Sequence, residues 1–137
     1  MTKIIIPNAQ QIVLLNQLVC SESGNPHLCN DVGKIESAVH SAFYPGTYPF
    51  AAGGLAQIAG ALCFYIVKSH AFMDGNKRTG ALAATTFLEQ NEWELRYPVN
   101  FSTGEDAFAA IIENCAAGNV TKEALMEWFD VHKVEIE

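Results

Sequence analysis

The chain has 137 residues, the length of one compact domain, and half of them are hydrophobic, which is enough to form a buried core. The formal charge is −7, so an acidic surface argues against direct, sequence-independent binding to nucleic acid. The apolar part of MTKIIIPNAQQ is too short for a signal peptide, and no apolar run could cross a bilayer. We therefore expect a cytoplasmic protein with one domain over residues 1–137 and no membrane contact.

The four cysteines form no CxxC pair. Cys63 and Cys115 fall inside apolar periodic runs, which predicts buried free thiols. Cys20, His27 and Cys29 lie close together in the sequence, but no second pair of ligands follows at zinc-finger spacing. We therefore expect no metal at these three residues.

The first predicted elements are helical. Ile4–Ile6 is either a short strand or an extended lead-in. Pro7 and Asn8 then open a helix of about three turns. Its expected apolar stripe consists of Ile12, Leu15, Leu18 and Val19. Residues 21–30, rich in Gly, Pro, Asn and Ser, are a predicted loop. Asp31 can cap a second helix, carrying Ile35, Ala38, Val39 and Ala42, that ends near Tyr44-Pro45-Gly46.

The segment Thr47–Ala52 has strand-like spacing of aromatic residues, with Tyr48 and Phe50 on either side of Pro49. A proline and the closing pair Gly53-Gly54 favour an edge strand or flap over a central strand. An ordinary surface loop is the alternative interpretation.

Two apolar helices follow. The first begins at Leu55 and stops at Ser69-His70, and the second runs from near Lys77 to Asn91. Further on, Ser102-Thr103-Gly104-Glu105 fits a capping box before a helix, and Thr121 can cap a last one. Together these predicted elements indicate an all-α fold, a compact bundle of about six helices with a short β-hairpin flap between the second and third helices.

The segment between the two apolar helices carries the chemistry. A loop entering a helix N-terminus presents unpaired N–H groups, which form a site for anions. Gly75 allows close approach of a phosphate to the backbone, and Asn76 adds an amide donor. Lys77 supplies a point charge, and Arg78 can bind two phosphate oxygens. No Gly-Lys pair is present, so this is not a Walker A loop.

Two more residues complete the set. Asp74 can hold Mg²⁺, which usually takes one or two carboxylates and substrate phosphates. His70 can accept a proton from a hydroxyl, because histidine is the side chain that ordinarily titrates near neutral pH. Structural alternatives stay open: His70 or Asp74 can cap a helix, and Lys77 and Arg78 can be solvated cations. Phe72 is predicted to anchor the loop in the core.

His70 to Arg78 resembles the signature of the Fic/Doc family, HxFx(D/E)GNxR. The resemblance extends to Lys34–Ala38, Tyr48–Ala52 and Leu88–Asn91, and residues 1–30 are its least clear part. It is closest to the Doc toxins of Phd–Doc toxin–antitoxin modules. Lys77 stands where the adenylylating Fic enzymes have a second glycine, and Ala81 where they have a second arginine.

The resemblance implies transfer of the terminal phosphate of ATP, with Mg²⁺, to a Ser or Thr hydroxyl of a protein. Elongation factor Tu is the implied target, which would block translation. By resemblance His70 is the base, Asp74 the Mg²⁺ ligand, and Tyr48, Phe50 and Ala51 belong to a flap that holds the target. The implied nucleotide site consists of Phe72, Gly75, Asn76, Lys77 and Arg78. The second hypothesis is transfer of AMP instead of phosphate. The third is an inactive scaffold that only binds partners.

Regulation is also implied by the resemblance. Many Fic proteins inhibit themselves with an (S/T)xxxE(G/N) helix, and Ala109–Asn114 nearly fits this pattern but has alanine at the hydroxyl position. We interpret Glu113 as an ordinary helix-surface residue, with self-inhibition as the alternative. Control is then expected from a separate Phd-like antitoxin.

Overall fold

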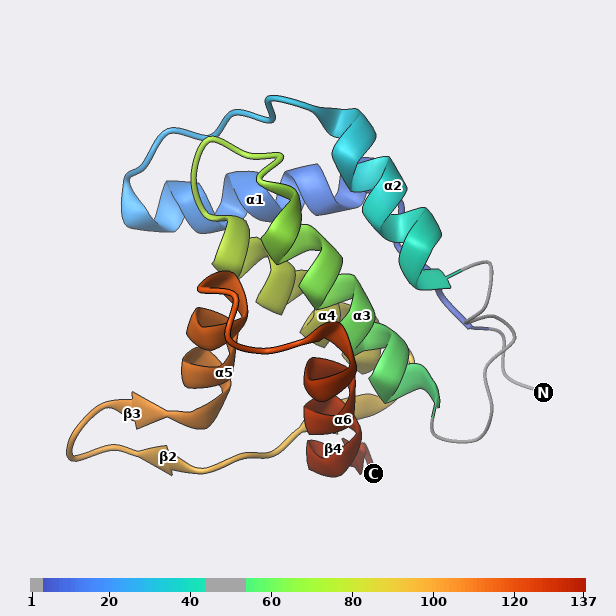
Figure 1. Cartoon of the computed structure of the whole chain (residues 1–137), viewed down its shortest axis with the longest axis vertical. Helices are drawn as coiled ribbons and strands as arrows, with labels where there is room; N and C mark the ends of the chain where they lie inside the picture. Colours follow the sequence, from blue (N-terminus) through green and yellow to red (C-terminus); the bar gives the residue numbers. More distant parts are fainter. Residues whose placement is uncertain (1–3, 44–53) are drawn as a thin grey trace.

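The computed structural model describes residues 4–43 and 54–137 (Figure 1). The expected turn at 44–46 and the expected flap with Tyr48, Phe50 and Ala51 therefore lie outside the described residues. The described part holds six helices: α1 (Ala9–Ser23), α2 (Val32–Phe43), α3 (Gly54–Ser69), α4 (Asn76–Gln90), α5 (Ala107–Ala116) and α6 (Lys122–His132). This confirms the all-α prediction.

Helix α3 runs through the middle of the molecule and packs against α2, α4 and α6 (Figure 1). Two glycines let the helices approach closely. A Cβ on Gly60 would lie 2.8 Å from the Cα of Met126 on α6, and a Cβ on Gly80 of α4 would lie 2.7 Å from Cγ2 of Val67. Because α3 is covered on several sides, its sequence is apolar almost throughout.

Helix α1 begins as predicted but ends later. Asn8 forms a reciprocal capping box with Gln11, and Gly24 ends the helix in a left-handed conformation with φ 72°. The predicted loop thus starts three residues too early, since residues 21–23 are still helical. The predicted apolar stripe is wrong at Leu18, which is 51% exposed, because the buried face turns toward Asn16 and Cys20.

Short strands after α4 were not predicted. β1 (Trp93–Leu95) pairs antiparallel with β4 (Lys133–Glu135), with Trp93 opposite Glu135. β2 (Val99–Asn100) pairs antiparallel with β3 (Glu105–Asp106), and this hairpin projects from the body of the molecule (Figure 1). In contrast, Ile4–Ile6 is an extended lead-in and not a strand.

The predicted capping box at Ser102–Glu105 is wrong. The segment is the turn between β2 and β3, where Oδ1 of Asn100 accepts hydrogen bonds from the N–H groups of Ser102 and Thr103. Asn100 satisfies these donors locally, so the helix starts only at Ala107. Its true N-cap is Asp106, whose carboxylate accepts from two N–H groups of the first turn at 2.9 and 3.0 Å.

Two further predictions, on the cap of α6 and on the buried cysteines, are confirmed. Thr121 caps α6 by accepting a hydrogen bond from the N–H of Ala124 at 3.1 Å. Cys63 and Cys115 are fully buried free thiols. None of the helices in the described residues has the length and apolar character that crossing a membrane requires.

Candidate active site

The loop of residues 70–75 joins α3 to α4 and is held by the segment that precedes α2. The N–H of Met73 donates to the carbonyl of Leu28 at 2.9 Å, and the N–H of Asn30 donates to the carbonyl of Ala71 at 2.8 Å. Phe72 is 3% exposed and packs in the core, which confirms its predicted role as an anchor. These contacts fix the path of the loop from one side.

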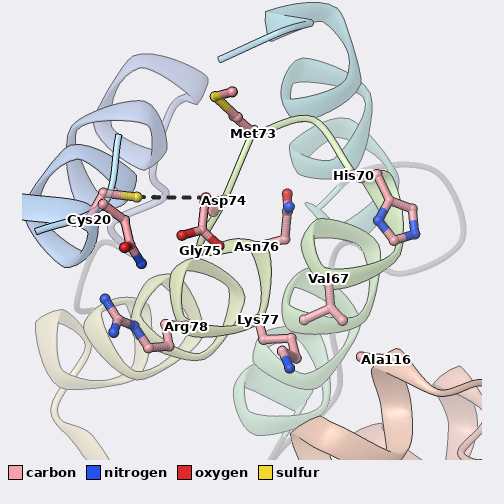
Figure 2. Close-up of a pocket in the computed structure, with 11 residues that line it drawn as sticks. Cys20, Val67, His70, Met73, Asp74, Gly75, Asn76, Lys77, Arg78 and Ala116 are labelled. Atoms are coloured by element: carbon pink, nitrogen blue, oxygen red, sulfur yellow. Dashed lines mark hydrogen bonds between the residues drawn. The ribbon is translucent and has the colours of Figure 1, made fainter. Parts of the chain in front are cut away.

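Helix α1 holds the loop from the other side. Asn16 is buried, and its Nδ2 donates to the carbonyl of Asp74 at 2.8 Å and to Oγ1 of Thr79 at 3.1 Å. The thiol of Cys20 lies 3.7 Å from the same Asp74 carbonyl (Figure 2). An amide in the apolar face of α1 is stable there because its hydrogen bonds are satisfied. The least clear part of the sequence therefore supports the predicted site.

Gly75 stands at the start of α4 with φ +76°, a conformation that favours glycine. An added Cβ would also lie 3.2 Å from Nδ2 of Asn16 and 3.2 Å from Sγ of Cys20. Within the described residues, no side chain caps this N-terminus by a hydrogen bond, so Asp74 does not act as its cap. The first N–H groups of α4 consequently remain available to a ligand.

The side chain of Asn76 braces the loop. Its Oδ1 accepts a hydrogen bond from the N–H of Phe72 at 3.1 Å, and its Nδ2 donates to the carbonyl of Phe72 at 3.0 Å. The amide plane of Asn76 is thereby fixed across the loop. The backbone N–H of Asn76 stays at the open helix end, where it can contribute to binding an anion.

Lys77 and Arg78 leave α4 in different directions (Figure 2). The Lys77 ammonium pairs with Oε1 of Glu113 on α5 at 2.7 Å. Nη2 of Arg78 donates to the carbonyl of Val19 and to the hydroxyl of Ser23 in the last turn of α1. Both cations thus have partners at the rim of the loop and are not merely solvated.

His70 lies across the loop from Arg78, at the end of α3 (Figure 2). It is exposed and has a positive φ of 51°, which is uncommon for a residue other than glycine. The hydroxyl of Ser69, not the imidazole, bonds to the last turn of α3, donating to the carbonyl of Ile66 at 2.7 Å. The left-handed backbone at His70 follows directly on the end of α3, where helices commonly place a residue in this conformation, although glycine is the usual residue there.

These residues surround one cleft with a volume of about 320 Å³. Six of the seven residues predicted between 70 and 78 line it: His70, Asp74, Gly75, Asn76, Lys77 and Arg78. Sequence reasoning missed the rest of the wall, which consists of Cys20, Asn25, Val67, Met73 and Ala116. It also missed the contact of Glu113 with Lys77. Only the polar Asn16 within an apolar helix face could have signalled the part played by α1.

The side chains of the cleft can be compared with the ligands that Mg²⁺ requires. Among the described residues no group of three or more His, Cys, Asp or Glu side chains is placed to hold a metal ion. Asp74 is exposed at the cleft and has no ion pair within the described part. A single carboxylate fits Mg²⁺, which takes its remaining ligands from substrate phosphates and water. It does not fit an ion that needs a set of protein ligands.

The comparison with known families agrees with this arrangement. A model of the Fic/DOC family matches residues 7–88, which includes α1, the loop and nearly all of α4. Among curated proteins, none matches the chain in sequence. The matched region covers more than half of the chain and contains every residue that fixes the loop between α3 and α4. The chain belongs to the Fic/DOC family.

Proposed function

We propose that this chain transfers the terminal phosphate of ATP to a Ser or Thr hydroxyl of another protein and acts as a toxin. The Fic/DOC family transfers phosphate-containing groups from nucleotides to proteins. One observation carries the assignment to this chain: an uncapped helix N-terminus, two cations, a carboxylate and a histidine surround a single cleft.

Phosphate binding follows from the start of α4. The free N–H groups after Gly75 and the positive end of the helix dipole attract an anion. Arg78 binds α1 through Nη2, so Nε and Nη1 remain as donors. Lys77 has one carboxylate partner and keeps two further N–H donors. The chain can therefore hold a polyphosphate along this helix end.

The reaction needs a base and charge neutralisation. In the proposal His70 accepts the proton of the attacking hydroxyl, and its exposed position leaves room for a protein segment. Asp74 would hold Mg²⁺, which when bound neutralises negative charge on the phosphates. Loop hydrogen bonds from Asn16 and Asn76 keep these groups in place, since phosphoryl transfer depends mainly on positioning.

The choice of phosphate over AMP rests on Lys77 and Ala81. A lysine at position 77 fills space that glycine would leave for nucleotide phosphates, and Lys77 lines the cleft while its ammonium pairs with Glu113 at the rim. Adenylyl transfer is the second candidate, because the uncapped helix and Arg78 would serve either reaction. A scaffold without activity is the third, and the complete set of cleft residues argues against it.

Labelled ATP distinguishes the first two candidates. Wild-type protein should transfer label from the γ-phosphate and none from the α-phosphate to proteins of a cell extract or to purified elongation factor Tu. The product should gain about 80 Da, and not about 329 Da as for AMP. Lys77→Gly should allow some α-label to appear, and His70→Ala should abolish both. Transfer of α-label by the wild type would refute phosphate transfer.

The toxin assignment has a separate test. Expression of the wild type should slow growth, His70→Ala should not, and a Phd-like antitoxin should relieve the effect. Harmless expression of a folded, ATP-binding wild type would contradict the proposal. The flap with Tyr48, Phe50 and Ala51 remains a proposal as the element that holds the target.

A further inference from the structure

A second hollow lies between α2 and α3, away from the cleft residues of α4. It has a volume of about 330 Å³, and Ala38 forms part of its floor. Its polar lining consists of two lysines, three serines and a tyrosine: Lys34, Lys68, Ser37, Ser41, Ser69 and Tyr65. None of the described residues that line it is a carboxylate. We call it the α2–α3 groove.

The charge of this groove is unusual for the chain. The protein carries 15 acidic residues and only 8 lysines and arginines. Within the described residues, four of the cations pair with carboxylates. The three that have no carboxylate partner there are Arg78 in the cleft and the two groove lysines, Lys34 and Lys68. Uncompensated positive charge thus gathers in the groove of an otherwise acidic molecule.

The groove also offers hydrogen bonds suited to carboxylates. The Lys68 ammonium makes one long bond, 3.4 Å to the carbonyl of Cys115, and so keeps donors for a ligand. Ser37 and Ser41 are one helical turn apart on α2, so their hydroxyls lie in a row. The phenol oxygen of Tyr65 accepts a hydrogen bond from Lys122 at 3.2 Å, which adds a third ammonium at the edge.

The position of the groove relates it to the cleft. Ser69 lines the groove, and the next residue, His70, lines the cleft. A chain segment lying in the groove would therefore pass close to the group that accepts the hydroxyl proton. An extended row of donors between two helices is better suited to binding a peptide than to binding a single small ion.

We propose that the α2–α3 groove binds an acidic peptide segment, and that this segment belongs to the protein whose hydroxyl is modified. The second half of this statement rests on the proposed function. The carboxylates of the segment pair with Lys34 and Lys68 and accept hydrogen bonds from the hydroxyls of Ser37 and Ser41. The acidic surface outside the groove and the active-site cleft repels such a segment, so the groove is the positive surface outside the cleft that can attract it.

The test measures binding without ATP. The probe is a fluorescein-labelled peptide with about eight glutamates around a threonine, followed by anisotropy at about 20 mM NaCl, where screening is weak. We expect binding by the wild type, binding weaker by about tenfold or more in Lys34→Gln/Lys68→Gln, and no change in Arg96→Gln/Lys133→Gln. Lys34→Arg/Lys68→Arg should retain binding, which shows that charge and not folding is responsible.

Three results would refute the proposal that the groove binds an acidic peptide. The first is binding by the Lys34→Gln/Lys68→Gln variant as tight as by the wild type, and the second is binding of a glutamine peptide as tight as that of the glutamate peptide. The third is selective displacement of the peptide by inorganic phosphate at matched ionic strength. The last result would assign the groove to a free phosphate anion. His70→Ala should bind the peptide normally. Peptide binding without any transfer from labelled ATP would refute the proposed function but not the binding site in the groove. Transfer without groove-dependent peptide binding would refute the binding site but not the proposed function.

Discussion

Lys77 is the cleft residue whose surroundings decide its role. Its ammonium lies 2.7 Å from a carboxylate oxygen of Glu113, and both side chains are substantially exposed. An exposed pair of this kind is weak, so a nucleotide phosphate can replace Glu113 as the partner. Glu113 is on the helix surface, as expected, but it is not an ordinary surface residue, because it competes for the cation of the cleft.

This competition gives a prediction at the residue scale. Glu113→Gln should free the Lys77 ammonium and lower the KM for ATP by about two- to fivefold, the range that a weak surface pair allows. Steady-state transfer with γ-labelled ATP measures this change. Glu127→Gln, an exposed glutamate on α6, is the matched control and should leave the KM unchanged. A higher KM in Glu113→Gln would mean that Glu113 positions Lys77 for ATP and does not compete with it.

Asn16 carries a second prediction at this scale. Asn16→Ala removes the donor to the partly buried Asp74 carbonyl and to the fully buried Thr79 hydroxyl. Unsatisfied groups of this kind cost about 1–3 kcal/mol, so urea unfolding should show a loss of that size. Transfer activity should also fall, because Asp74 loses its support. Gln10→Ala, at an exposed amide on α1, should change neither, and an unchanged Asn16→Ala would remove α1 from the site.

At the scale of elements, the helices were predictable because they carry two independent signals. Apolar residues at helical spacing mark α3 and α4, and capping residues such as Asn8 and Thr121 mark where helices begin. The strands have only two or three residues each, too few to show an alternating pattern. The error at Ser102–Glu105 has the same origin, since a turn and a capping box use the same residue types.

The site was predictable only where it is continuous in the sequence. His70 to Arg78 form one segment, so their chemistry could be interpreted together before the structure. Asn16 and Cys20 on α1 and Glu113 on α5 contact the same segment from other parts of the chain. The sequence around them offers only weak signals, namely a polar residue in an apolar helix face at Asn16 and an incomplete inhibitory motif around Glu113. Tertiary packing places them there, and packing between distant helices cannot be derived from local patterns.

The close packing of α3 gives a prediction at the element scale. Gly60→Ala places a Cβ 2.8 Å from the backbone of α6, which cannot move aside as a side chain can. Overpacking of this kind costs about 1–3 kcal/mol, and thermal unfolding should show a lower Tm. Gly33→Ala is the matched control, since its Cβ meets only the movable Asp31 carboxylate at 3.1 Å, and the change favours a helix. Equal Tm values for the two variants would contradict the close α3–α6 contact.

For the whole molecule, ionisable groups outside the cleft determine the response to alkaline pH. Burial raises the pKa of the Cys63 thiol well above its ordinary value of 9.0 and also raises the pKa of Cys115. Burial raises the pKa of Tyr97, and the hydrogen bond to Tyr65 raises the pKa of Lys122. All four groups therefore hold their protons more firmly in the folded chain than in the unfolded chain.

This common direction fixes the sign of the pH dependence. Above about pH 9 the unfolded chain loses protons that the folded chain keeps, so the free energy of unfolding should fall as the pH rises. Each group whose two states differ by one bound proton contributes a slope of about 1.4 kcal/mol per pH unit. Urea unfolding at about pH 7, 8, 9 and 10 measures the slope. Cys63→Ala/Cys115→Ala should lower stability at every pH, because methyl-sized cavities form, but should flatten the alkaline slope. A free energy of unfolding that stays constant or rises above pH 9 would show that the buried thiols ionise as readily in the fold as outside it.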